Sequence, residues 1–195
     1  MGRETRQQII NAYFRLALKS PEQSEFSLTE IAKEAQISRQ AIYQKHYRNV
    51  QEIKEDLSSQ LLRHMEKVFG EQKHQAHHKF LENFAEHVLP LLYQYRQDLR
   101  AFYTTSLSAH WQIKSESFFQ KWLRPYLKNK YKNKRLNINK MAFAMSKMLS
   151  ALIATWLTED FPLPASCFKQ TFLNLLTNFS ETAVKESFFR HPKIA

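Results

Sequence analysis

The chain has 195 residues, of which 43% are hydrophobic and 24% are charged, a balance typical of a folded globular protein. It contains only two glycines, which favours helices joined by short connections and argues against a Gly-rich phosphate loop. The formal net charge of +11 favours an anionic partner such as nucleic acid. The single Cys167 excludes an intramolecular disulfide bond.

The apolar pattern predicts an all-α chain of about nine helices. Ser27 with Glu30, and Asn49 with Glu52, have the spacing of a capping box, in which a side-chain oxygen and a carboxylate satisfy free amides at a helix start. Ser38 is placed to cap a further helix between them. Apolar residues that recur every three or four positions predict the remaining helices. The expected ranges are 4–19, 28–35, 39–46, 50–69, 80–95, 99–109, 111–127, 138–157 and 164–188.

The first three helices predict a helix-turn-helix at about residues 27–47. A small core is expected from apolar side chains at Leu28, Ile31, Ala35, Ile37, Ile42 and Tyr47. With that core buried, the third helix exposes donors, acceptors and a small apolar contact suited to base edges in a major groove: Arg39, Gln40, Ala41, Gln44 and Lys45. Residues expected at helix starts or on the flanks, where they would hold phosphates, are Ser27, Thr29, Ser38, Tyr43, His46, Tyr47 and Arg48.

The segment FSLTEIAKEAQISRQAIYQKHYRNVQEI resembles the N-terminal domain of the TetR family of bacterial regulators. The matching residues are Thr29, Ile31, Ala32, Ala35, Ile37, Ser38, Tyr43, His46 and Tyr47. The resemblance implies a helix-turn-helix DNA-binding domain over residues 1–49 and a ligand-binding and dimerisation domain over residues 50–195. It further implies a cytoplasmic homodimer that binds double-stranded operator DNA and regulates transcription, as a repressor released by a small-molecule effector.

Two positions depart from the family pattern. Gln36 stands in the turn where the family usually has glycine, so a strained or altered backbone is expected there. Two residues separate Tyr43 from His46, where the common pattern has one. Either the recognition helix is longer by one residue, or His46 and Tyr47 take shifted roles.

Broad apolar faces on the last two helices predict a homodimer interface, because they exceed what one edge of a small core can cover. The candidate interface residues are Met145, Leu149, Leu152, Trp156, Phe168, Phe172, Leu175 and Phe179. An alternative is that both faces are core within one chain. The resemblance also implies an effector pocket in the helical body, suited to an apolar or aromatic molecule. Its candidate lining residues are Phe84, His87, Tyr93, Phe102, Tyr103, Trp111, Phe118, Phe119, Trp122 and Met148.

Other functions receive less support from the sequence. No nucleophile elbow or convincing pair of carboxylates indicates an enzyme, and no cofactor is expected. His74 and His78 have a spacing that can hold zinc, but nothing completes such a site, and no metal is expected. The basic stretch 124–140 is interpreted as a solvated surface, with contact to nucleic acid or lipid as the alternative. No signal peptide opens the chain and the longest apolar stretch carries Lys147, so no membrane partner is expected. The alternative function is a helical co-regulator that binds a ligand or partner through a degenerate helix-turn-helix.

Overall fold

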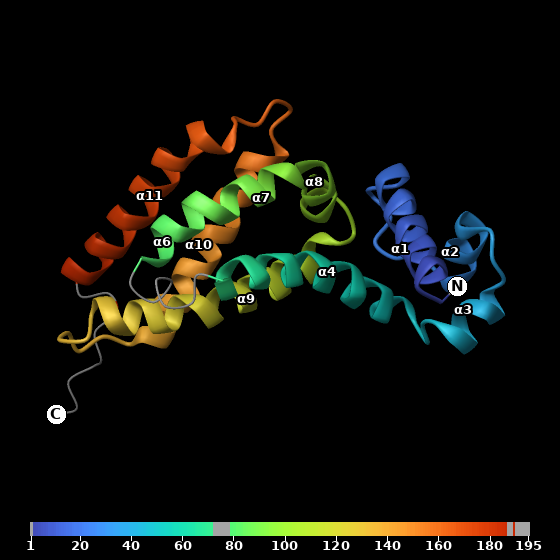
Figure 1. The fold of residues 1–195 in the computed structure, drawn as a ribbon, viewed down its shortest axis with the longest axis horizontal. Coiled ribbons are helices and arrows are strands. Elements are labelled where there is room, and N and C mark those ends of the chain that lie inside the picture. Colours follow the sequence, from blue (N-terminus) through green and yellow to red (C-terminus); the bar gives the residue numbers. More distant parts are fainter. Residues whose placement is uncertain (1, 72–78, 187–188, 190–195) are drawn as a thin grey trace. The chain divides into compact units, whose positions relative to one another are not determined.

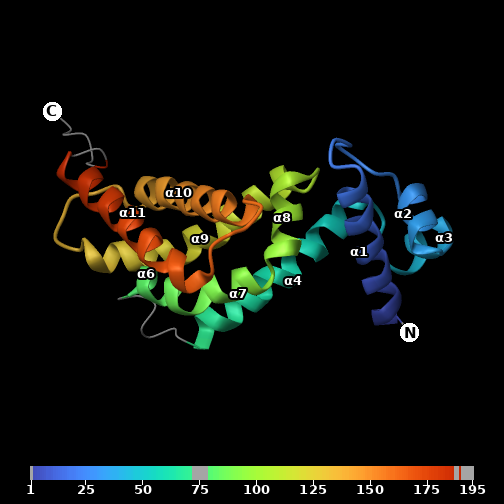
Figure 2. The ribbon, with the colours of Figure 1, turned by 90° about the horizontal axis from the view of Figure 1, so that it is seen from above.

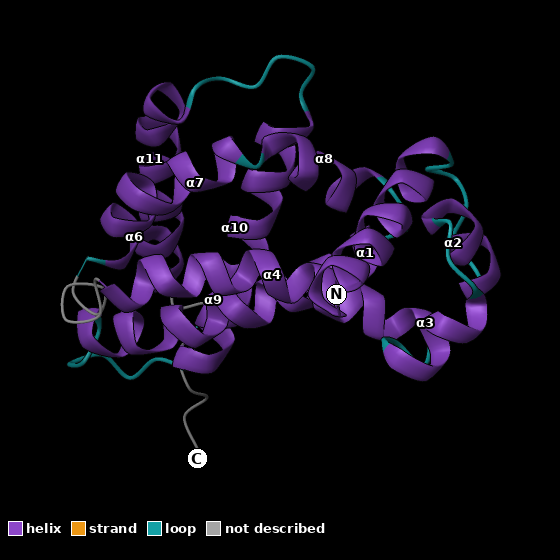
Figure 3. Ribbon diagram, turned by 45° about the vertical axis from the view of Figure 1, so that its right-hand side comes forward, coloured by secondary structure: helices purple, strands orange, loops and turns teal. Residues whose placement is uncertain are grey.

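The computed structural model describes residues 2–71, 79–186 and 189, and within these residues the chain is helical with no β-strand (Figures 1 and 3). If residues 80–94 are taken as one continuous rod, the described part forms nine helices. The predicted all-α class is confirmed. The chain divides into two compact units: unit 1 comprises residues 1–63 and 97–112, and unit 2 comprises residues 64–96 and 113–195.

Unit 1 is built around α1 (Gly2–Lys19), which packs against α2 (Leu28–Ala35), while α2 packs against α3 (Arg39–Lys45). It also contains the first part of α4 (Val50–Glu71), nearly all of α8 (Arg96–Thr104) and the start of α9 (Ser108–Lys130). Fully buried side chains at Tyr13, Ile31, Ile42 and Ile53 come from four of these helices, so they form one shared core. In that core Tyr13 meets Phe26 edge to face at 5.8 Å.

Unit 2 is a helical bundle in which α11 (Ala165–Lys185) packs against α10 (Ile138–Thr158) and against the rod of residues 80–94 (Figure 2). Its core is aromatic. Phe84 stacks on Phe172 at 5.3 Å and meets Phe119 edge to face at 5.7 Å, while Phe80 lies 5.8 Å from Tyr126. These rings come from the rod, α9 and α11, so they bind the bundle together.

The rod of residues 80–94 is not a uniform α-helix. It consists of α6 (Phe80–Asn83), a π-helical turn (Phe84–Val88) and α7 (Leu89–Gln94). The Leu89 amide donates to the Phe84 carbonyl, the i to i−5 bond of a π-turn. Pro90 lies in the first turn of α7, where its missing N–H is tolerated.

Several predicted boundaries differ from the observed ones. α9 continues through Pro125 to Lys130, so the loop expected from residue 128 is shorter and α9 is longer. The chain was expected to divide at residue 49, whereas the compact units place the first part of α4 with α1–α3. One physical reason is a salt bridge from Arg6 in α1 to Asp56 in α4.

By length and composition alone, α10 could cross a membrane, and half of its most apolar stretch is buried inside the protein. Core helices of water-soluble proteins meet the same criterion.

Candidate nucleic-acid interface

The start of α2 is fixed by the predicted capping box. The Ser27 hydroxyl oxygen accepts from the Glu30 amide at 3.2 Å, and the Ser27 amide donates to the Glu30 carboxylate at 2.7 Å. The Ser27 hydroxyl also donates to this carboxylate, so it is engaged in capping and not free for a phosphate. These hydrogen bonds hold the pKa of Glu30 below its ordinary value, chiefly through the Ser27 amide. Thr29, one position into the helix, is exposed.

The turn between α2 and α3 has a left-handed residue at Gln36, with φ 56° and ψ 39°. The Ile37 amide donates to Ala32 at 3.1 Å and the Gln36 amide donates to Lys33 at 3.2 Å, which is the Schellman arrangement at a helix end. The altered backbone expected where the family has glycine is therefore present. Gln36 adopts the glycine conformation and accepts the steric strain of a side chain there.

α3 ends one residue earlier than the sequence predicts. Ser38 caps its start by accepting from the Ala41 amide at 3.1 Å, and α3 ends at Lys45. His46 leaves helical geometry with φ −130°, and the amides of His46 and Tyr47 both donate to the Ile42 carbonyl. His46 and Tyr47 therefore lie outside α3, and the two alternatives for the extra residue stay predictions.

One face of α3 presents polar side chains to solvent. Ile42 is fully buried and anchors the helix, whereas Ala41 is half-buried. The exposed side chains of this face and of the following turn are Arg39, Gln40, Tyr43, Gln44, Lys45 and Arg48. Within the described residues, none of these side chains makes an intramolecular hydrogen bond or salt bridge. They are therefore free to bind a partner.

Tyr47 was predicted both as a core residue and as a DNA contact, and the structure supports only the core position. Its side chain is 1% exposed, and its hydroxyl donates to Asp56 Oδ2 at 2.7 Å. Burial, followed by the neighbouring Asp56 carboxylate, raises the pKa of Tyr47. A hydroxyl held in this way cannot reach a phosphate, so the prediction of Tyr47 as a DNA contact is wrong for this conformation.

Asp56 joins three segments of unit 1 and had no signal in the sequence. It accepts from Tyr47, from Arg6 Nε at 2.8 Å, and lies 3.9 Å from Arg63. Burial alone would raise the pKa of Asp56, but the hydrogen bonds from Tyr47 and Arg6 outweigh burial and lower it. Arg6 lies 50 positions from Asp56, while Tyr47 and Arg63 lie nine and seven positions away. None of these is the spacing of a helix cap or of an i, i+4 pair, so no local pattern indicates this cluster.

The predicted effector-pocket residues fall into two separate groups. Phe102, Tyr103 and Trp111 belong to unit 1, where the Trp111 ring lies 4.7 Å from Phe102 and 6.3 Å from Tyr103. The unit 2 members Phe84, Phe118, Phe119 and Trp122 are buried core residues. Tyr93 stacks on Trp156 at 5.8 Å. Packing against neighbouring rings explains the burial of these aromatic side chains without a ligand.

The last two candidate pocket residues are not core residues. His87 is exposed on the π-helical turn and does not point into an apolar stripe. Met148 lines a groove on the outer surface of α10 and α11 together with Leu152 and Leu175.

The predicted dimer residues separate into core and surface. Met145, Leu149, Trp156 and Phe172 are at most 3% exposed within a single chain, so they have no area left to bury in an interface. For these four residues the alternative, core within one chain, is correct. Leu152, Phe168, Leu175 and Phe179 keep exposed area and line two neighbouring grooves.

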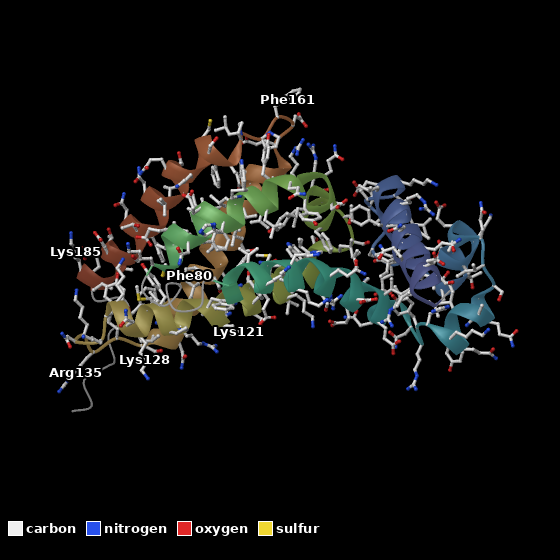
Figure 4. All side chains as sticks on the ribbon, viewed as in Figure 1. Phe80, Lys121, Lys128, Arg135, Phe161 and Lys185 are labelled. Carbon is white, nitrogen blue, oxygen red and sulfur yellow. The ribbon has the colours of Figure 1, made fainter. Side chains whose placement is uncertain are left out.

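The remaining candidates are two histidines considered as metal ligands and the basic stretch 124–140 considered as a nucleic-acid surface. His74 and His78 lie outside the described residues, and within the described part no cluster of potential metal ligands is found. Figure 4 shows Lys128, Arg135 and Lys185 at one end of unit 2. Tyr126 and Tyr131, whose rings lie beside Lys130 and Lys134, are buried, so they offer no ring for a base to stack on.

No protein-family model matches the chain, and no curated protein matches it.

Proposed function

We propose that the protein is a sequence-specific, DNA-binding transcriptional regulator of the kind that the TetR family represents. The observation that carries the proposal is the solvent-facing side of α3. Ile42 anchors this helix in the core, while Arg39, Gln40, Gln44 and Lys45 are exposed with no partner among the described residues. Guanidinium, ammonium and amide groups on one short helix are the groups that read base edges and phosphates in a major groove.

The local geometry supports a helix that is presented rigidly. α2 and α3 each begin with a serine cap, and the turn between them is closed by two backbone hydrogen bonds. A recognition helix needs this rigidity because its side chains must match fixed positions on the DNA duplex.

A homodimer is part of the proposal, since two half-sites on DNA require two reading helices. The partly exposed Leu152 of α10, and the exposed Leu163 and Leu175 of the connecting loop and α11, would lie in its interface. An apolar or aromatic effector bound in unit 2 completes the proposal. It is supported by the π-helical turn Phe84–Val88, because π-turns occur frequently at functional sites.

Selection from an unbiased duplex library, followed by fluorescence anisotropy on the enriched sequence, tests the proposal. The expected result is binding that exceeds binding to a scrambled duplex by about a thousandfold or more at physiological salt. Weak binding that ignores sequence and disappears with salt would show only a basic surface.

A matched pair of variants identifies the element responsible. Gln44→Ala changes an exposed glutamine of α3, and Gln170→Ala changes an exposed glutamine of α11. The first should alter the selected sequence, and the second should leave it unchanged. A folded protein that selects no sequence in either form would contradict the proposal and favour a co-regulator with a degenerate helix-turn-helix.

A further inference from the structure

Arg6 occupies an unusual position beside the end of α3. Its guanidinium carbon lies 4.8 Å from the centre of the Tyr47 ring, and its Nε lies 3.0 Å from the Tyr47 hydroxyl and 2.8 Å from Asp56 Oδ2. A single N–H is therefore shared between two acceptors on one edge of the guanidinium. Because Tyr47 follows α3 by two residues, Arg6 is held at the end of the exposed helix.

The contacts with Tyr47 and Asp56 cover only part of the Arg6 side chain. The side chain is 51% exposed, and within the described residues its two terminal nitrogens make no hydrogen bond. Those nitrogens carry four N–H donors in a planar fork that matches the oxygens of a phosphate. The Asp56 carboxylate and the Tyr47 hydroxyl raise the pKa of Arg6, which ensures that it stays charged.

Tyr47 and Asp56 are suited to orient Arg6 and not to bind DNA themselves. The Tyr47 side chain is 1% exposed and the Asp56 side chain is 15% exposed, and a carboxylate would repel a phosphate. Their hydrogen bonds fix the Arg6 plane against the ring, which reduces the side-chain entropy that a free arginine would lose on binding.

We propose that Arg6 is a phosphate-binding residue of the DNA interface and that Tyr47 and Asp56 are its positioning residues. This inference rests on the proposed function and adds to it a contact from α1, outside the helix-turn-helix. One partner phosphate accepts from the two terminal nitrogens while Nε remains on Asp56. Such a contact adds affinity for every sequence and does not discriminate between bases.

The test is the salt dependence of binding to the selected duplex for the wild-type protein, Arg6→Gln and Arg15→Gln. Loss of one phosphate contact should reduce the slope of log K against log salt by about 0.9 and weaken binding roughly tenfold, equally for selected and scrambled duplexes. Arg15 is the control, because it lies on the same helix with 47% exposure but its guanidinium is engaged by Glu34. Its replacement should leave the slope unchanged.

The same titrations test the proposed DNA-binding function and the role of Arg6 separately. Absence of sequence-specific binding by the wild-type protein would overturn the proposed function, and this inference with it. Specific wild-type binding with an unchanged slope in Arg6→Gln would overturn the inference alone. If Arg6→Gln unfolds, Arg6→Met removes the charge while keeping an apolar stem against the Tyr47 ring, and the same slope change is expected.

A double-mutant cycle tests the positioning role. Tyr47→Phe should weaken DNA binding about threefold or more in the wild-type background and have no further effect in Arg6→Gln. Equal losses in both backgrounds would show that Tyr47 acts without Arg6 and would overturn its assignment as a positioning residue.

Discussion

Gln36 carries the clearest local strain in the described part of the chain, where no other non-glycine residue has a positive φ. The left-handed region brings a β-carbon close to the following carbonyl oxygen, which costs about 1–2 kcal/mol for most residues. The two hydrogen bonds of the turn and the buried Ile42 beyond it hold the conformation in place. The strain is therefore local and removable by one substitution.

Gln36→Gly should raise the free energy of unfolding by about 1 kcal/mol, because glycine adopts this conformation without strain. Urea denaturation measures the change. Gln44→Gly is the matched control, since Gln44 lies within α3, and there the same substitution should lower stability by up to about 1 kcal/mol. A loss of stability in Gln36→Gly would contradict the strain argument.

Acid should weaken the Asp56 cluster. The pKa of Asp56 in the folded protein lies below its ordinary value of 3.8, so the unfolded chain binds more protons at low pH. Its contribution to stability is complete above that ordinary value and is lost as the pH falls through the lower folded pKa. Urea denaturation between about pH 5 and about pH 3 should show this decline, and Asp56→Asn should make the dependence on pH less steep.

At the scale of elements, different residues of α3 are expected to make different kinds of contact with DNA. Tyr43 is 59% exposed and lies where a flanking contact is expected, while Gln40 and Gln44 carry amides that can pair with base edges. Tyr43→Ala should weaken binding to every duplex about equally, as loss of a phosphate contact does. Gln40→Ala should change which bases are selected. Anisotropy on the selected and scrambled duplexes separates the two effects, and an unchanged preference would remove Gln40 from the reading face.

Local chemistry made the starts of α2 and α3 predictable. Ser27, Glu30 and Ser38 specify these helix starts through bonds to residues three positions away, and the structure has these bonds. The end of α3 was less predictable, because the apolar pattern fits an end at either Lys45 or His46. The buried Tyr47 beyond it contacts Asp56 and Arg6, which lie nine and 41 positions away, so the pattern within α3 does not contain these contacts.

At the scale of the whole molecule, the apolar groove of α10 and α11 is the surface proposed to form the dimer interface. Leu175→Arg places a charge in the groove that Leu152 and Phe168 also line, and it should convert a dimer to monomers in sedimentation equilibrium. Leu175 is 41% exposed within one chain, so the substitution should leave the fold intact. Ile113→Arg, at a site with 70% exposure on α9, is the control and should remain dimeric. A wild-type protein that is already monomeric would contradict the proposed interface.

The sequence predicted which helices of unit 2 are apolar but not which apolar side chains face outward. α10 is apolar on several sides, so Met145 and Leu152 look alike in a periodic pattern. Only the packing of α11 against α10 and against the rod of residues 80–94 buries the first and leaves the second partly exposed. The sequence could not separate pocket residues from core residues for the same reason, since aromatic rings at helical spacing serve a core equally well.

The position of Trp156 makes it an intrinsic optical reporter. Its indole lies against the Phe168 ring at 4.4 Å, donates to the Leu163 carbonyl at 2.8 Å, and forms part of the wall of the outer groove. With Trp111 and Trp122 replaced by phenylalanine, the fluorescence of the protein would come from this wall. Its emission would then follow the hydration of the groove without any attached dye.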